Sequence, residues 1–395
     1  MKTFPYSVSA VAGRRAGIAL CAAIAVAIAV PSFLHSSATA QPNLQIRNLP
    51  KLQVQIQPAL LSKLQANKLR VSAADLDRNF LVKKNLPFIK LANGEEKQLL
   101  PLSMMEGAPQ ADTSQLPPEV ADDAPYIRAA KATDIVRQSV FQINPQIFIP
   151  LSVDHRPSMT SIKDQGNRGT CVAFASNAAM EIFASIPNDL SEQYTNDLFM
   201  RKENRQACDA GIKTTDAAAY LGDGTVTESV WNYTLSAPAC NTVPPAAAAT
   251  AKKYKITDAQ LIGDGGPSGA ASIKNPRYLE SLLRSGKNIV LGTHVAWGSA
   301  NAQGVLDVVI DPNTNQPAAS RGGHAMLICG YNALGDYFIV KNSWGSGFGH
   351  SGYAYLSYDY IRTYAKYGYF IRKVSPTLLI MPNINERILR QPILR

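Results

Sequence analysis

The chain has 395 residues, 46% of them hydrophobic, a composition that predicts a globular protein with room for two or three domains. Its formal net charge of +10 would suit a nucleic-acid-binding protein. However, the lysines and arginines are scattered without a dense basic run, and Lys2, Arg14 and Arg15 lie in a segment that we expect to be removed. The charge therefore favours a mildly basic secreted protein and no nucleic-acid partner.

Residues 1–40 have the pattern of a secretory signal peptide. The basic residues just named precede an apolar run over 18–30, and Ala38-Thr39-Ala40 forms an A-x-A cleavage site. The apolar run is too short for a membrane span. We therefore predict an exported chain, periplasmic or extracellular, without stable membrane insertion after signal removal. Disulfides persist in such an environment.

Residues 41–126 carry no candidate catalytic residue. The elements predicted within them are a helix over 59–70, a helix starting at 72–75, strands over 80–82 and 88–89, and a turn at Asn93-Gly94. The stretch 107–125 is Pro-rich and acidic, which predicts an exposed linker open to proteolytic nicking. Two interpretations of 41–126 stay open: an inhibitory prosegment, and an adaptor or envelope-binding domain that stays attached.

The next region, 127–373, changes from a helical to a strand-rich texture along the chain. Its first half predicts a helix over 127–142, a strand over 147–149, a helix from Cys171 that ends before Pro187, and a helical or irregular stretch over 188–222. Its second half predicts strands over 288–292, 305–310, 325–329, 337–341 and 353–356. This order predicts an α+β enzyme whose site lies between two lobes. Residues 374–395 form a C-terminal tail.

The stretch 160–184 holds the strongest chemical signal. A polar turn over 164–169 precedes Cys171, and apolar residues then recur at helical spacing, so Cys171 is predicted to lie in the first turn of a buried helix. The N-terminus of a helix favours a thiolate over a thiol, and a thiolate beside a base is a nucleophile. A lone cysteine is more often an inert buried thiol, so the assignment depends on partners elsewhere.

Two downstream residues supply those partners. His324 follows a Gly-rich loop at the start of a predicted strand, and Asn342 directly follows the strand 337–341. A thiol needs a base, and an asparagine amide can orient one imidazole nitrogen while the other faces the sulfur. Gln165, shortly before Cys171, can form an oxyanion hole with the Cys171 N–H. We interpret three other histidines as structural: His155, His294 and His350.

Over about 151–372, the chain resembles the papain-like cysteine peptidases. The resemblance rests on short motifs in the order and at the spacing of that family. They are Ser152-Val153-Asp154-His155-Arg156, Asp164-Gln165-Gly166, Cys171 with Ala173-Phe174-Ala175, Leu190-Ser191-Glu192-Gln193, Cys208-Asp209-Ala210-Gly211, Gly323-His324-Ala325 and Asn342-Ser343-Trp344-Gly345. The histidine and asparagine lie slightly beyond the roughly 130–150 residues downstream of the cysteine that the family shows.

The resemblance implies a two-lobe α+β fold, a helical lobe plus a β-barrel-like lobe, with the active site in the cleft between them. It implies a monomeric peptidase acting on peptides or proteins without a metal or cofactor. The implied roles are Gln165 as oxyanion donor, Cys171 as nucleophile, His324 as acid and base, Asn342 as its orienter and Trp344 as a shield for the His–Asn hydrogen bond.

The resemblance also implies where a substrate binds. Gly211 would pair with the backbone of an extended peptide, and Ile212 and Lys213 would line the main specificity pocket with Gly323 at its floor. We expect the pocket to take an apolar side chain against Ile212 and to tolerate an acidic one beside Lys213.

Several residues depart from the family pattern. Arg168 stands where the family has a disulfide-bonded cysteine, and aromatic positions are changed at Val172, His155 and Phe348. Cys208 matches the cysteine whose partner has become Arg168, and Cys240 matches another family cysteine. By this resemblance, we predict a bridge between Cys208 and Cys240, with Cys171 and Cys329 free. These departures leave every catalytic atom in place.

Two other classes of function stay open. A catalytically inactive relative acting as a binding module would be marked by loss of one of the four catalytic residues, and all four are present. An acyltransferase or transpeptidase would use the same triad on an amine acceptor instead of water. The motifs around the cysteine, and the upstream glutamine above all, favour the peptidase.

Overall fold

The computed structural model describes residues 73–107, 150–184, 186, 189–205, 211–235, 244–264, 271–297 and 304–375. Several predictions lie outside these residues: the signal peptide, the helices over 59–70 and 127–142, the strand over 147–149, nearly all of the linker, the Cys208–Cys240 bridge and most of the C-terminal tail.

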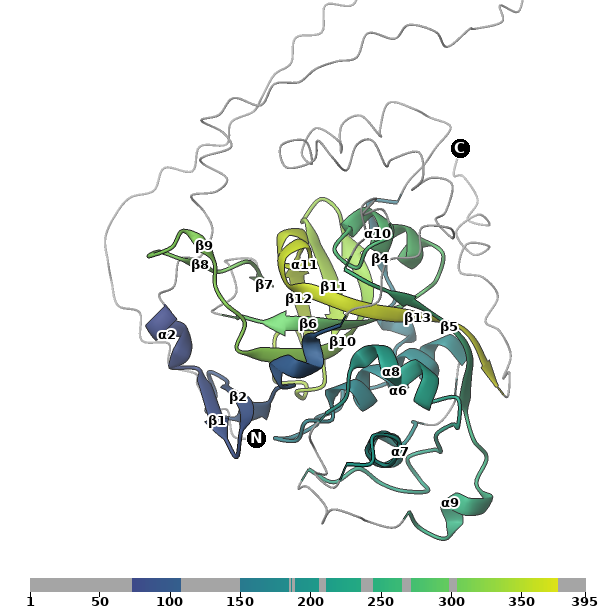
Figure 1. Cartoon of the computed structure of the whole chain (residues 1–395). Helices are drawn as coiled ribbons and strands as arrows, with labels where there is room; N and C mark the ends of the chain where they lie inside the picture. Colours follow the sequence, from purple (N-terminus) through teal and green to yellow (C-terminus); the bar gives the residue numbers. More distant parts are fainter. Residues whose placement is uncertain are drawn as a thin grey trace, which may run out of the picture. The chain divides into compact units, whose positions relative to one another are not determined.

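An eight-stranded sheet forms the centre of the described region (Figure 1). The order along its main path is β5-β13-β6-β10-β11-β12-β7, and β4 pairs with β10 beside this path. The strands are β4 Ser152–Asp154, β5 Lys255–Ile262, β6 Ile289–Val295, β7 Val305–Leu306, β10 Gly322–Asn332, β11 Tyr337–Lys341, β12 Tyr353–Ser357 and β13 Ala365–Ser375. Within the described ranges, no pairing joins β5 to β7, so the sheet is open rather than a closed barrel.

Helices cover the sheet on two sides, as Figure 1 shows. Those from the first half of the chain are α6 Cys171–Ala184, α7 Glu192–Lys202, α8 Thr214–Tyr220 and α9 Ala247–Thr250. Those from the second half are α10 Pro276–Arg284 and α11 Tyr358–Tyr364, and a short 3-10 turn, η2, spans Arg156–Ser158. Two short strands, β8 Ile310–Asp311 and β9 Gln316–Pro317, form a separate small hairpin.

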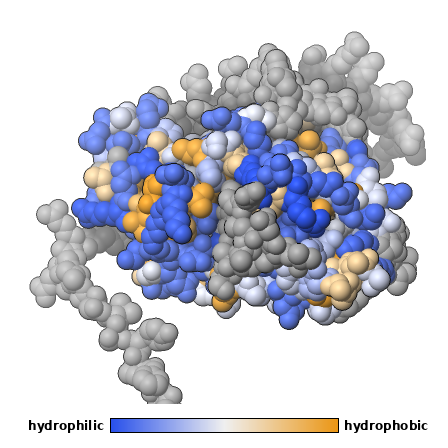
Figure 2. All heavy atoms as spheres, turned by 60° about the horizontal axis from the view of Figure 1, so that its bottom comes forward, coloured by the Kyte–Doolittle hydropathy of each residue, from blue (hydrophilic) through white to orange (hydrophobic). Residues whose placement is uncertain are grey.

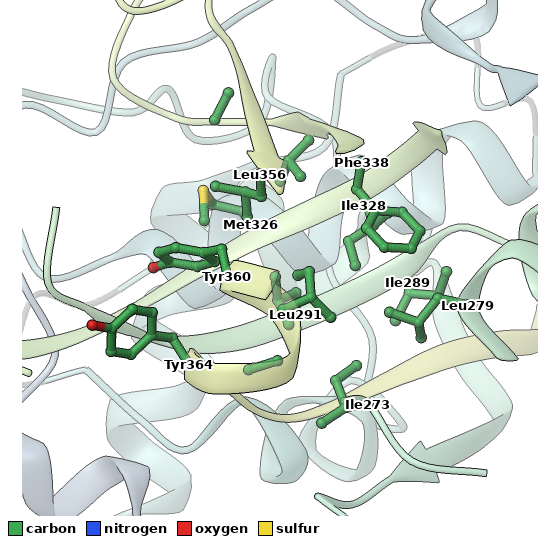
Figure 3. Packing of buried hydrophobic residues seen from close by; sticks show 14 of the residues in the cluster. Ile273, Leu279, Ile289, Leu291, Met326, Ile328, Phe338, Leu356, Tyr360 and Tyr364 are labelled. Carbon is green, nitrogen blue, oxygen red and sulfur yellow. The ribbon is translucent and has the colours of Figure 1, made fainter. Parts of the chain in front are cut away.

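Two hydrophobic cores lie on opposite faces of the sheet, because neighbouring residues of a strand point to opposite sides. In β10, Met326 and Ile328 belong to the core under α10 and α11, which Figure 3 shows from close by. Ala325 and Leu327 of the same strand belong to the core that α6, α7 and α8 cover. A strand buried on both faces is apolar at almost every position, which explains its uninterrupted apolar sequence.

The α+β prediction is confirmed, and the helix start at Cys171 and the strand over 337–341 lie where the sequence predicts them. The predicted strand over 305–310 is wrong, because it is divided into β7 and β8. Asp307 ends β7: its Oδ1 accepts the N–H of Val308 (2.7 Å) and the hydroxyl of Ser357 (2.5 Å), which takes that backbone donor out of the ladder.

The N-terminal segment 73–107 folds against both cores. It contains α2 Ala73–Asp77, a three-stranded antiparallel sheet of β1 Phe80–Lys83, β2 Leu86–Lys90 and β3 Glu96–Gln98, and a 3-10 turn, η1, over Leu102–Met105. Its buried side chains divide between the two cores. Leu76, Ile89 and Leu99 join the core of α10 and α11, whereas Leu100 and Met105 join the core of α6. The segment therefore packs against the cores on both faces of the central sheet.

The face seen in Figure 2 is mostly hydrophilic, with apolar residues in small separate groups. Large apolar side chains with substantial exposure come from separate elements: Val82, Leu102, Phe183, Leu235, Leu261 and Leu334. None of the helices described here is long and apolar enough to cross a bilayer.

Candidate active site

Cys171 is the first residue of α6, and its side chain is fully buried. Thr170 directly precedes the helix, and its carbonyl accepts the N–H groups of Ala173 (2.9 Å) and Phe174 (3.3 Å). Burial raises the pKa of the Cys171 thiol to about 12, although the backbone N–H groups of Ala325, Val172 and Cys171 itself favour the thiolate. In this closed arrangement the sulfur is therefore protonated, and it lies beside the residue that follows His324.

His324 lies within β10, two positions after the strand begins, and pairs across the sheet with Thr293 of β6. Its Nε2 donates to Asn342 Oδ1 at 2.8 Å, and its Nδ1 has no hydrogen-bond partner among the described residues. Burial lowers the pKa of His324 to about 4, against the opposing effect of the Asn342 hydrogen bond. The imidazole is therefore neutral, its orientation is fixed from one side, and Nδ1 is available to accept a proton.

An aromatic cluster packs around the His324 ring. Trp344 lies against it with a centroid distance of 4.6 Å, where the sequence resemblance implies a shield for the His–Asn bond. Trp297 also contacts the cluster, 6.1 Å from the His324 ring and 5.2 Å from Trp344, and its Nε1 donates to Tyr360 Oη. Sequence analysis missed Trp297, because it follows β6 outside any motif. Its only signal was an aromatic residue directly after an apolar strand.

Gln165 is fully buried between the loop that precedes Cys171 and the residues that directly follow β11. Its backbone N–H donates to Ser343 O (2.8 Å), and its Oε1 accepts the Ser343 hydroxyl (2.6 Å). Its Nε2 donates one N–H to Arg168 O at 2.6 Å. An amide nitrogen carries two N–H groups, so a second donor remains for an oxyanion.

A cluster of buried charges lies behind Asn342 and joins the two lobes. Lys163 Nζ contacts Glu192 at 2.8 Å, from the nucleophile loop to α7. Lys341, the residue before Asn342, donates to the carbonyl of Thr160, whose hydroxyl in turn donates to Glu181 of α6. A cavity of about 20 Å³, large enough for one water molecule, lies among these side chains. The ion pair thus joins the loop before Cys171 to α7, and the hydrogen bonds of Thr160 join Lys341 of β11 to α6.

The predicted substrate-binding residues lie under the N-terminal segment. Leu100 and Gly323 exchange two backbone hydrogen bonds of 2.7 Å each, as one antiparallel bridge beside His324. A Cβ at Gly323 would overlap Met105 Sδ, and a Cβ at Gly211 (φ +70°) would overlap Leu100 Cδ2. Ile212 is buried in the same core as these side chains. The segment therefore occupies the surface where a substrate is expected to bind.

Polar contacts fasten this segment on both sides of the bridge. Lys97 Nζ pairs with Asp164 at 2.8 Å, next to Gln165, and Arg321 pairs with Asp77 at 2.5 Å. On the other side, the Tyr367 hydroxyl donates to Met104 O. Half-buried Lys213 lies near Gly107, where the described segment ends.

The remaining predicted residues have structural environments. Cys329 is a buried free thiol, as predicted, 3.6 Å from Ile339 O. His155 Nδ1 donates to Asn288 Oδ1 (2.9 Å), and His350 Nε2 donates to Gly304 O (3.1 Å). Within the described part of the chain, no group of three or more His, Cys, Asp or Glu side chains is arranged to hold a metal ion.

Comparison with known proteins identifies the family. The family model described as papain family cysteine protease matches residues 149–367, more than half of the chain. The chain belongs to the papain family of cysteine proteases. The α+β fold described above, with a helical and a strand-rich lobe, is that of a papain-family member.

Individual relatives are distant and match only in part. Vignain of Vigna mungo is 29% identical over 216 residues, which cover 52% of this chain and 53% of vignain. Ananain of Ananas comosus is 25% identical over 246 residues, covering 60% and 64%. Among solved structures, xylellain, a cysteine protease from Xylella fastidiosa, matches with 24% identity and a TM-score of 0.47 over 57% of this chain and 87% of its own. The chain thus spans less than two thirds of the length of these curated relatives.

Proposed function

We propose that this papain-family chain is a cysteine endopeptidase that hydrolyses peptide bonds through Cys171, His324 and Asn342. The observation that carries the proposal is the buried His324–Asn342 hydrogen bond, which leaves Nδ1 unpartnered in the strand next to the first turn of α6. This arrangement offers a nucleophile, a base and an orienter of the base.

The proposed reaction uses each of these atoms in turn. His324 Nδ1 takes the Cys171 proton, and the thiolate attacks the substrate carbonyl carbon. The oxyanion accepts hydrogen bonds from the Cys171 N–H and the free N–H of Gln165. The imidazolium then protonates the departing amine as the C–N bond breaks, which leaves a thioester. Water, deprotonated by His324, attacks the thioester, and the carboxylic acid and thiol are released.

Peptide hydrolysis with and without an amine acceptor separates this proposal from its alternatives. We expect the processed protein to release a free carboxylate from a peptide amide, with or without added amine. An acyltransferase would instead transfer the acyl group mainly to the amine, and an inactive binding relative would release neither product. Mass spectrometry of the products distinguishes these outcomes.

Gln165→Ala tests the proposed oxyanion hole. Removing one such donor typically lowers kcat by about 10²- to 10³-fold with little change in KM. Gln260→Ala, on the edge strand β5, is a matched amide deletion away from the hole, and it should have a much smaller effect on kcat. Steady-state kinetics on one peptide substrate measure both. An unchanged rate in Gln165→Ala would mean that another group binds the oxyanion.

We further propose that residues 41–126, of which the structure describes 73–107, are an inhibitory prosegment rather than a retained adaptor domain. Three observations support this: its bridge to Gly323, the position of Leu100 against Gly211, and the burial of its apolar side chains in both cores. Its removal would admit water to the cleft, and the pKa values of Cys171 and His324 would then approach those of a thiolate–imidazolium pair.

The same contacts support an apolar specificity pocket. Met105 lies over Gly323 and shares a buried core with Ile212, so a side chain of the prosegment occupies the space proposed for that of the substrate. We propose an apolar preference at this subsite, with Lys213 at its edge allowing an acidic residue. We also propose that the predicted signal peptide over 1–40 directs export, to a periplasmic or extracellular location, and that the mature protein is a monomer.

A further inference from the structure

Arg168, one of the residues that depart from the family pattern, is a buried cation in the loop before Cys171. Only 1% of its side chain is exposed. Its Nη1 donates to Gln193 Oε1 on α7 at 2.9 Å and to Thr234 O at 2.7 Å. The centre of its guanidinium lies 4.6 Å from the ring centroid of Tyr233, a cation–π distance. A buried charge is costly without such partners, so these contacts fix the loop around Tyr233 against Arg168.

Tyr233 connects Arg168 to the loop that precedes Cys171. Its hydroxyl donates to Gln165 O at 2.8 Å and lies 2.8 Å from Thr170 Oγ1. Since the single phenolic proton goes to Gln165, the Thr170 hydroxyl donates to the Tyr233 oxygen. Its ring also packs edge-on against Phe174 of α6, with a centroid distance of 4.8 Å. One side chain thus contacts the backbone of the proposed oxyanion donor and the residue directly before the nucleophile.

We propose that Arg168 and Tyr233 are positioning residues for the oxyanion hole, a non-covalent link where the family pattern has a disulfide-bonded cysteine. This inference rests on the proposed function. The two donors of the hole, Gln165 Nε2 and the Cys171 N–H, lie at opposite ends of one turn, and Tyr233 touches both ends. Arg168 holds Tyr233 in place through its ring face and the carbonyl of Thr234. The distance between the two donors therefore depends on this link.

Tyr233→Phe tests the proposal, because it removes only the hydroxyl and keeps the ring under Arg168. In protein processed from the full chain, we expect kcat to fall about 10- to 100-fold, as it does when donors are misplaced, with KM within about threefold. Affinity for a peptide aldehyde, whose adduct places an oxygen in the hole, should fall with kcat. Alkylation of Cys171 by iodoacetamide, which needs no oxyanion hole, should stay within about twofold.

Two further variants separate positioning from general destabilisation. Tyr364→Phe is the matched control: it removes a hydroxyl that donates to Ala318 O (2.9 Å) in the other core, and its kcat should be unchanged. Arg168→Met should repeat the Tyr233→Phe pattern, and Arg168→Lys should restore part of the loss. If Arg168→Met does not fold, the kcat and the aldehyde affinity of Tyr233→Phe alone decide whether the proposal holds.

The outcomes distinguish this inference from the proposed function. A wild-type protein that hydrolyses peptides, with Tyr233→Phe at the same kcat and aldehyde affinity, overturns the positioning role but keeps the peptidase. A parallel loss of the alkylation rate in Tyr233→Phe would also overturn it, because the defect would then lie in the nucleophile. A wild-type protein without hydrolysis would instead contradict the proposed function itself.

Discussion

Cys171→Ala is expected to abolish peptide hydrolysis, with a loss of about 10⁶-fold in kcat, the size seen when a protease nucleophile is removed. Among the described residues, the other free thiol, Cys329, lies buried in the sheet against Ile339 and away from the site. Alanine is already common along α6, so the helix should form normally. Release of a fluorescent group from a peptide substrate by the processed protein measures the loss.

Cys329→Ala is the matched control for this variant. It makes the same chemical change at a buried free thiol away from the site, so it should cost some stability and leave kcat close to wild type. His324→Ala should be comparably damaging to Cys171→Ala, whereas Asn342→Ala should cost less because it only orients the imidazole. Turnover by Cys171→Ala near the wild-type rate would overturn the assignment of the nucleophile.

Cleavage and release of the N-terminal segment are expected to raise both turnover and Cys171 alkylation by at least about 100-fold. In the covered state the sulfur and imidazole are fully buried and neutral, and a substrate cannot reach Gly211 or Gly323 while Leu100 and Met105 lie there. A chain starting at Gln41, with a specific protease site inserted into 107–125, allows both rates to be measured before and after cutting. The Cys171→Ala form of this chain should stay intact without added protease.

Substitutions within the segment test whether it acts through the cleft. The separate 41–125 fragment should inhibit the mature enzyme, and Met105→Asp should weaken that inhibition about 100-fold because it would bury a charge among apolar side chains. Val82→Asp is the control, since Val82 lies on β1 and is 76% exposed. If the uncut chain is fully active and the fragment does not inhibit, the segment is a retained domain and not a prosegment.

Local sequence patterns predicted the helix that begins at Cys171 well, and the surroundings of His324 less well. Cys171 begins α6 because a polar turn gives way directly to apolar residues at helical spacing, and both signals are local. The pair Gly322-Gly323 suggested a loop before His324, but both glycines lie inside β10. A Cβ at Gly322 would be too close to Leu99, and one at Gly323 would overlap Met105, so both positions favour glycine. Such contacts between distant segments produce no periodic pattern in the sequence.

Other parts of the site were beyond sequence patterns for the same reason. Residues 41–126 showed no catalytic residue, yet Leu100 pairs with Gly323, next to His324, through a single bridge made by tertiary contact. The strand β13 and the helix α10 were not predicted; β13 contains Tyr367 and Tyr369, and α10 begins at Pro276, directly after its N-cap Asn275. The role of Tyr233 likewise depends on a hydroxyl contact with a residue far away in the chain.

The aromatic cluster around His324 has a spectroscopic consequence. The chain has three tryptophans, and two of them, Trp297 and Trp344, pack against the His324 ring, whereas Trp231 lies beside Tyr194. A protonated imidazole quenches the fluorescence of an adjacent indole far more strongly than a neutral one. Intrinsic emission at the indole wavelength therefore reports the charge of this one histidine. When the N-terminal segment is released and the Cys171–His324 ion pair forms, the intrinsic tryptophan fluorescence should decrease. Activation can therefore be followed in real time without a label.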